Sequence, residues 1–162
     1  MNPLNQSHPP EPMVKEPIQV FTVGFTKKTA AQFFQKLRAA GIRRVVDVRL
    51  NKVSQLAGFS KRDDLRYFLK AILDVDYIEA PILAPTQDLL DAYKKKRGRW
   101  EDYERDFLSL MKDRHIEDKI DPSMLAGGCL LCSEDKPHQC HRRLVVEYLQ
   151  HCWGNLTVQH IV

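Results

Sequence analysis

The stretch that decides the fold is IQVFTVGFTKKTAAQFFQKLRAAGIRRVVDVRL, residues 18–50. Its first eight residues form a continuous apolar and β-branched run, which is typical of a strand covered on both faces. Residues 28–40 then carry apolar side chains at helical spacing, with Thr26 as a candidate cap and Gly41 as a terminator. Residues 43–50 form a second short apolar run. The pattern predicts a strand–helix–strand unit with parallel strands.

The rest of the chain continues this alternation. Apolar periodicity predicts helices over residues 60–73, 86–96, 100–114 and 140–152, and strands over residues 76–83, 127–132 and 156–162. Ser60 is the expected N-cap of the first of these helices. Strands that alternate with helices predict an α/β fold with a mostly parallel sheet and helices on both faces, a Rossmann-like three-layer architecture.

Length and composition predict a single domain with a tail. The chain has 162 residues, which suits one hydrophobic core. Residues 1–17 hold five of the nine prolines and no apolar periodicity, so we expect a disordered proline-rich tail followed by one domain over residues 18–162. No apolar run approaches the roughly 18 residues of a membrane span, and the N-terminus lacks signal-peptide features. We therefore expect a cytoplasmic protein without a membrane partner.

Polar side chains gather where three predicted strands end. In open parallel sheets, functional groups collect in the crevice beyond the carboxyl ends of the strands. The residues concerned are Thr22, Gly24 and Thr26 for the first strand, Asp47, Arg49 and Ser54 for the second, and Cys132, Glu134, Cys140, His141 and Arg142 for the strand over residues 127–132. Their convergence is the main physical argument for a site.

The stretch CSEDKPHQCHRR, residues 132–143, carries the most reactive side chains. Cys140 and His141 fall in the first turn of a predicted helix, where backbone N–H groups lower the pKa of a thiol and attract anions. A thiolate there is a candidate nucleophile, with His138 or His141 as the nearby base and Glu134 as orienting group, acid or base. The alternative is that Cys140 caps the core and that Arg142 pairs with Glu134 or Asp47.

The same stretch raises the question of a metal. Cys129, Cys132, Cys140 and His141 are the ligand types of a structural zinc site. However, residues three apart on a strand point to opposite faces, so Cys129 and Cys132 would not converge. We therefore expect no four-ligand zinc site, while a metal held by Cys132, Cys140 and a histidine remains an alternative.

Two charged segments allow more than one interpretation. Asp47 and Arg49 share a face at a strand end and form either part of an anion or ribose pocket or a structural ion pair. The basic run KKKRGRW, residues 94–100, is either a nucleic-acid contact with an aromatic for base stacking or a solvated helix end. The formal net charge of +4 permits an anionic partner without requiring one.

Three motifs, taken in order, resemble a known family. TVGFT (22–26), DVRLNKVSQLAGFSKRDDL (47–65) and CSEDKPHQCHRRLVVEYL (132–149) are similar to the DUF488 family, which carries a TIGHS-like start, a DVR…P.S…F segment and a C-x-E…CHR end. The resemblance implies a compact α/β fold with the motifs at one site, and no settled reaction. Phe25 stands where the family pattern has histidine, and Lys52 where it often has proline. If that histidine is catalytic elsewhere, this member binds without turnover or uses another residue.

The sequence thus favours an enzyme or enzyme-like protein that binds a small anionic or nucleotide-like substrate. The catalytic candidates are Cys132, Glu134, Cys140 and His141, and the substrate-binding candidates are Thr26, Asp47, Arg49, Ser54 and Arg142. No cofactor is expected, and no oligomeric state is indicated. A nucleic-acid-binding module and a metal-binding protein are the alternatives.

Overall fold

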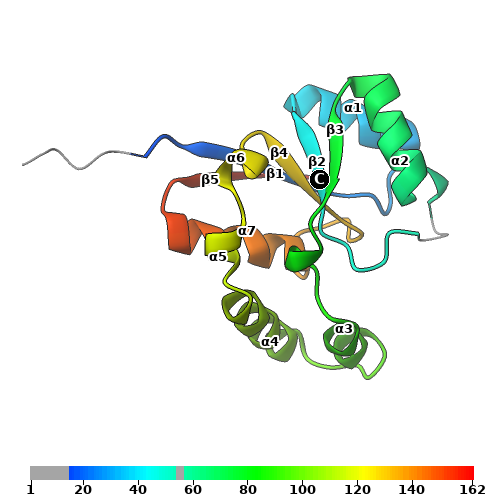
Figure 1. Ribbon diagram of the computed structural model, residues 1–162. Helices are drawn as coiled ribbons and strands as arrows, with labels where there is room; N and C mark the ends of the chain where they lie inside the picture. The colour runs from blue at the N-terminus through cyan, green and yellow to red at the C-terminus, as the bar shows by residue number, and fades with distance from the viewer. Residues whose placement is uncertain (1–14, 54–56) are drawn as a thin grey trace, which may run out of the picture.

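Five strands form one parallel sheet in the computed structural model, which describes residues 15–53 and 57–162 (Figure 1). The strands are β1 (Ile18–Gly24), β2 (Arg44–Asp47), β3 (Asp76–Glu79), β4 (Gly128–Cys132) and β5 (Leu156–Ile161), in the spatial order β3-β2-β4-β1-β5. All four neighbouring pairs run parallel. The predicted α/β class is confirmed. Most of the predicted tail, residues 1–14, lies outside the described residues.

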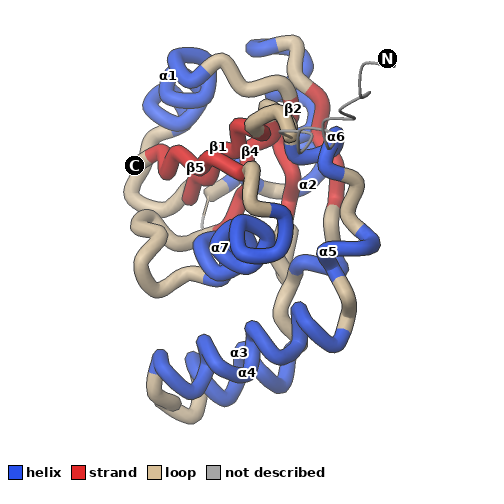
Figure 2. The backbone as a smooth tube through the Cα atoms, turned by 90° about the vertical axis from the view of Figure 1, so that its left-hand side faces the viewer, coloured by secondary structure: helices blue, strands red, loops and turns tan. Residues whose placement is uncertain are grey.

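Helices cover both faces of this sheet. They are α1 (Ala30–Ala40), α2 (Arg62–Phe68), α3 (Gln87–Lys94), α4 (Trp100–Asp113), α5 (Ile116–Lys119), α6 (Pro122–Leu125) and α7 (His141–Trp153), with 3-10 turns at Gly58–Ser60 and Pro81–Leu83 and a π-helical turn at Leu69–Leu73. α1 and α2 pack on one face, and α7 packs on the other (Figures 1 and 2). No helix in the described part of the chain is long and apolar enough to cross a membrane.

The core divides into two apolar clusters, one on each face of the sheet. Successive strand residues point to opposite faces, so in β4 Leu130 joins the cluster with α7, whereas Cys129 and Leu131 join the cluster with α1. In β1, Val20 and Phe21 divide in the same way. A strand that faces two cores needs apolar residues at every position, which explains the continuous apolar runs in the sequence.

The helices α3 and α4 form a hairpin beyond α7, outside the three layers (Figure 2). One side of α4 buries Tyr103, Phe107 and Met111 against the same cluster as α7. The hairpin thereby forms a wall beside the carboxyl end of β4.

Two predicted helix starts are wrong. Thr29, not Thr26, caps α1, because its Oγ1 accepts from the Gln32 amide at 3.1 Å while the Gln32 side chain accepts from the Thr29 amide at 2.9 Å. This reciprocal pair satisfies two free N–H groups of the helix, which Thr26 lies too far away to do. Ser60 does not cap α2, which begins after Lys61; the Ser60 hydroxyl instead donates to the Ala57 carbonyl at 2.8 Å.

The strand order brings distant motifs together. β4 lies between β1 and β2, so the first two strands along the chain are not neighbours in the sheet. In register, Gly24 of β1 lies beside Cys132, and Asp47 of β2 lies beside Leu131. The three predicted strand ends therefore meet at one edge.

Candidate functional site

A cavity of about 160 Å³ opens at the carboxyl ends of β2 and β4. Residues after the two strands and at the start of α7 line one side of it, namely Arg49, Cys132, Glu134, Cys140 and His141. The α3–α4 hairpin lines the other side with Tyr93, Lys94, Trp100 and Tyr103. The cavity therefore gathers all four catalytic candidates and one of the five binding candidates.

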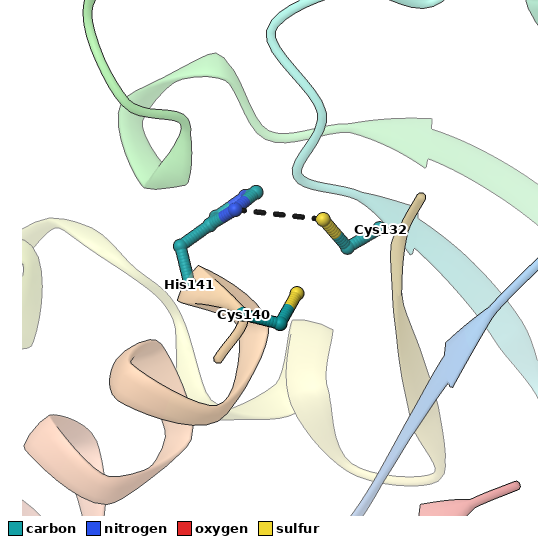
Figure 3. A group of neighbouring side chains, drawn as sticks. All are labelled: Cys132, Cys140 and His141. Carbon is teal, nitrogen blue, oxygen red and sulfur yellow. Dashed lines mark hydrogen bonds between the residues drawn. The ribbon is translucent and has the colours of Figure 1, made fainter. Parts of the chain in front are cut away.

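Two thiols and an imidazole form the inner end of the cavity. The side chains of Cys132, Cys140 and His141 point toward one another, the first from the end of β4 and the others from the start of α7 (Figure 3). Their sulfur and nitrogen atoms all lie within 4.8 Å of one another. All three residues are buried, with Cys132 5% and Cys140 2% exposed.

The backbone fixes the orientation and tautomer of His141. Its Nε2 lies 2.8 Å from the carbonyl oxygen of Val48, which can only accept, so Nε2 carries a proton and donates it. In the neutral ring Nδ1 is then an acceptor, and it faces the Cys132 sulfur at 3.4 Å. The arrangement is a thiol–imidazole pair oriented by a third group, which is the geometry of an activated nucleophile.

The two thiols differ in acidity. A hydrogen bond from the Cys140 thiol, assisted by the charge of Arg142 and by backbone N–H groups of Ser133 and Glu134, lowers the pKa of Cys132 despite its burial. The same hydrogen bond to Cys132, together with burial, raises the pKa of Cys140. The expectation that the helix N-terminus lowers the pKa of Cys140 is therefore wrong. Cys140 is the N-cap in extended conformation, but its side chain accepts no hydrogen bond from the helix and turns toward Cys132 instead.

Arg49 and Asp47 form a buried ion pair at the end of β2. Asp47 accepts from Nε at 2.9 Å and from Nη2 at 2.8 Å, and the Tyr77 hydroxyl also donates to this carboxylate. Arg49 is 2% exposed and its guanidinium lies over the Phe25 ring, 5.4 Å from the centroid. Its remaining nitrogen, Nη1, is buried and has no hydrogen-bond partner among the described residues. Phe25, which departs from the family pattern, thus packs directly against the arginine of the site.

Arg142 lies in the first turn of α7 and holds the loop after β4. Its guanidinium is fully buried and donates to the backbone carbonyls of Glu134 and Asp135, with Nη1 also 3.6 Å from the Cys140 sulfur. It is not among the residues that line the cavity. In this structure Arg142 therefore supports the loop after β4.

The remaining binding candidates are Thr26 and Ser54. Thr26 ties the loop after β4 through its backbone amide, which donates to the Ser133 carbonyl at 3.2 Å, and its side chain lines neighbouring pockets. Ser54 lies outside the described residues.

Glu134 stands at the mouth of the cavity, where Lys94 Nζ binds its carboxylate at 2.7 Å.

An aromatic wall was missed as part of the site. Tyr93, Trp100 and Tyr103 line the cavity, and the Trp100 and Tyr103 rings stack with centroids 5.3 Å apart at 29°. The sequence marked Trp100 only as a companion of the basic run and Tyr103 only as an apolar helix residue. No local signal shows that the hairpin docks on α7. Within the basic run, Lys94 is half exposed and pairs with Glu134, and Trp100 packs on Tyr103.

The geometry also bears on the metal question. Cys129 belongs to the core cluster on the opposite face of the sheet, as the strand periodicity predicts. Cys132, Cys140 and His141 remain close enough together to contact one ion.

Comparison with known proteins gives one match. The family model described as "Domain of unknown function DUF488" matches residues 29–149. No curated protein and no solved structure matches the chain.

Proposed function

The chain belongs to the DUF488 family, a domain of unknown function, and we propose that it is a thiol-dependent enzyme that binds a small anionic, nucleotide-like substrate in the cavity beside Cys132. The proposal rests on a single observation above all others. The buried Nη1 of Arg49 has no partner among the described residues, and this arginine lines the same cavity as the Cys132–His141 pair.

A buried donor without a partner costs about 1–3 kcal/mol, and more when it is charged. An anionic ligand in the cavity would satisfy this donor. Asp47 fixes the other two nitrogens of the guanidinium, so Nη1 is held in one orientation before a ligand arrives. Such a preorganised cationic donor favours recognition of a carboxylate or phosphate oxygen.

The chemistry follows from the hydrogen bonds. His141 Nδ1 takes the proton of Cys132, and the imidazolium is stabilised by donation from Nε2 to Val48. The Cys132 sulfur then attacks an electrophilic centre of the substrate and forms a covalent intermediate, while the leaving group takes the proton from Nδ1. Glu134 and Lys94, at the mouth, contact the substrate as it enters rather than the reacting sulfur.

The aromatic wall of the cavity favours a ligand that contains a flat ring. Tyr93, Trp100 and Tyr103 line the cavity together with the thiols and Arg49, and Tyr93 and Trp100 are partly exposed, so a planar group could pack against them. Stacking of a base on an aromatic side chain contributes about 1–3 kcal/mol. A ring beside an anionic group describes a nucleotide-like molecule.

Alkylation of Cys132 tests the proposal. Iodoacetate is a small anion and iodoacetamide is its neutral counterpart, so the ratio of their rates at Cys132, located by tandem mass spectrometry, measures attraction of an anion by Arg49. Arg49→Lys keeps a charge for Asp47 but leaves no donor at the position of Nη1, and we expect the ratio to fall about tenfold, equivalent to about 1.4 kcal/mol. Arg105→Lys, at an exposed arginine of α4, is the matched control and should leave it unchanged.

A second measurement uses the unmodified protein. Adenosine monophosphate should slow the iodoacetamide reaction at Cys132 more than inorganic phosphate does, because it adds the ring. If neither anion slows the reaction and the ratio for Arg49→Lys equals that of the unmodified protein, the proposal is wrong.

A metal centre is a second candidate, favoured by the mutual distances of Cys132, Cys140 and His141. Two thiolates and one imidazole with an open fourth position are a known catalytic zinc set. The guanidinium of Arg142, 3.6 Å from the Cys140 sulfur, places a positive charge beside that group and disfavours a cation. Elemental analysis of protein purified without a histidine tag decides between the two candidates.

A further inference from the structure

The two thiols of the cavity are placed to react with each other. Cys132 lies at the end of β4 and Cys140 at the N-cap of α7, and their sulfur atoms lie within 4.8 Å (Figure 3). A disulfide requires about 2.05 Å between sulfurs, so closure needs the two sulfur atoms to approach each other through side-chain rotation and a shift of the N-cap. Both side chains line the cavity, so a small oxidant that enters it reaches both.

No other pairing within the chain competes. Cys129 belongs to the cluster on the opposite face of the sheet, and Cys152 is exposed near the far end of α7. Cys152 follows Cys140 by twelve positions, which corresponds to about 18 Å along the helix axis. All four cysteines of the chain are described, so Cys132 and Cys140 are the pair that the fold brings together.

The connecting segment leaves room for this closure. Residues 133–139 form no helix or strand and join the two cysteines directly. Arg142 anchors the first half of this segment through the carbonyls of Glu134 and Asp135, whereas Arg143 holds the second half through the carbonyl of His138. Both arginines lie on α7, whereas Thr26 and Lys94 tie Ser133 and Glu134 to other elements, so the second half of the segment and the helix start are the parts that can shift.

We propose that Cys132 and Cys140 form a peroxide-sensitive dithiol that closes to an intramolecular disulfide and switches the site off. The switch rests on the proposed function, since it removes the nucleophile assigned there, but the disulfide itself does not depend on any substrate.

The chemistry balances in two steps. The Cys132 thiolate attacks one oxygen of hydrogen peroxide, an S–O bond forms, the O–O bond breaks, and hydroxide leaves to take up the proton from His141 as water. The Cys140 sulfur then attacks the Cys132 sulfenic acid, an S–S bond forms, the S–O bond breaks, and the departing hydroxide takes the Cys140 proton as a second water. Two thiols are oxidised and one peroxide is reduced. Afterwards Cys132 has no proton to share with His141 Nδ1.

The test is oxidation of the reduced full-length protein with equimolar hydrogen peroxide. We expect the intact mass to fall by two hydrogen atoms and the number of free thiols to fall from four to two. Cleavage after Glu134 under denaturing conditions separates Cys132 from Cys140, so the two fragments should stay joined until dithiothreitol is added. Alkylation of Cys132 by iodoacetamide should be lost on oxidation and regained on reduction.

Three cysteine variants distinguish the possible products of oxidation. Cys140→Ser lacks the second thiol and should stop at the sulfenic acid of Cys132, which dimedone traps. Cys132→Ser should form no intramolecular disulfide, and Cys152→Ser, the matched control, should behave as the unmodified protein. A disulfide through Cys152 between two chains overturns the inference, as does stoichiometric zinc that protects both thiols or stepwise addition of oxygen to Cys132 without loss of the Cys140 thiol. If the disulfide forms but anions leave alkylation unaffected, the proposed function fails and the dithiol stands.

Discussion

The carboxylate of Asp47 holds the guanidinium of Arg49 at two points, through Oδ1 to Nε at 2.9 Å and Oδ2 to Nη2 at 2.8 Å. Both residues are buried, and only one residue separates them along the chain. The sequence left open whether they form an ion pair or part of an anion pocket. The pair is observed, and it leaves the buried Nη1 of the guanidinium without a partner among the described residues, so the ion pair does not exclude an anion pocket.

Arg49→Met tests how strongly the fold depends on this pair. The substitution leaves the buried Asp47 carboxylate with the Tyr77 hydroxyl as its main side-chain partner, and loss of one member of a buried pair costs about 3–5 kcal/mol. Urea unfolding should show this loss. Arg105→Met removes an exposed arginine from α4 and should leave the midpoint unchanged. A midpoint for Arg49→Met equal to that of the control would contradict the assignment.

Gly24→Ala tests the close approach of β1 to the loop after β4. An added Cβ would overlap the backbone carbonyl of Glu134, the group that Arg142 holds. We expect the loop to shift, the free energy of unfolding to fall, and protection of Cys132 by adenosine monophosphate to weaken. Gly58→Ala, where a Cβ meets nothing within 4 Å, is the control. Unchanged protection in Gly24→Ala would show that the loop position does not matter for binding.

The sequence predicts which segments form strands and helices better than it predicts which of these elements lie side by side. Apolar runs such as residues 18–25 reveal strands buried on both faces, because each face has its own core. The insertion of β4 between β1 and β2 depends on pairing between segments about a hundred residues apart, for which no local signal exists. Docking of the α3–α4 hairpin on α7 was missed for the same reason.

The features of the site were also predictable only in part. The rule that strand ends converge was enough to bring Arg49, Cys132 and His141 together. The Val48 carbonyl that orients His141 was not predictable, because a backbone group carries no residue-type signal. The contacts of Arg142 were not predictable either, since the sequence does not show that carbonyls of its own loop surround it.

Tyr77→Phe tests a dependence of stability on alkaline pH. Burial and the hydrogen bond to Asp47 raise the pKa of Tyr77, so the folded chain keeps a proton that the unfolded chain loses near pH 10. The resulting stability is present in full below about pH 10 and is lost as pH rises above it. Tyr77→Phe should lower the free energy of unfolding by about 1–3 kcal/mol at neutral pH and make the alkaline decline less steep. Tyr67→Phe, at an exposed tyrosine, is the control, and parallel alkaline slopes for Tyr77→Phe and the unmodified protein would refute the prediction.

Cys140→Ala tests the source of the acidity of Cys132. The rate of alkylation follows the thiolate, so it rises with pH and levels off above the pKa of Cys132. In the unmodified protein the inflection should lie below the ordinary thiol value of about 8.5, because the Cys140 thiol donates to Cys132. Removal of that donor should move the inflection to higher pH and slow the reaction at neutral pH about tenfold for each pKa unit. Cys152→Ala should not move it, and an unshifted inflection in Cys140→Ala would assign the acidity to Arg142 and the backbone N–H groups of Ser133 and Glu134 instead.

Glu134→Gln separates two roles for the carboxylate at the mouth of the cavity. Glu134 binds Lys94 at 2.7 Å, and both side chains are about half exposed, at 45% and 49%. If Glu134 acts only through its charge, Glu134→Gln frees the ammonium of Lys94 and should raise the rate of iodoacetate at Cys132 about two- to threefold at low salt, where screening is weak. The iodoacetamide rate should not change.

Two further variants test whether the effect on the iodoacetate rate comes from charge at the mouth of the cavity. Lys94→Met should lower the iodoacetate rate, and Glu16→Gln, at an exposed position before β1 at the opposite edge of the sheet, should have no effect. Both effects should shrink as salt is added, because charges at the mouth are screened within about 10 Å at 0.1 M. If Glu134 were instead the base that takes the Cys132 proton, Glu134→Gln would slow iodoacetate and iodoacetamide alike at every salt concentration. The position of Glu134, bound to Lys94 while His141 Nδ1 faces the Cys132 sulfur at 3.4 Å, favours the first outcome and leaves the proton with His141.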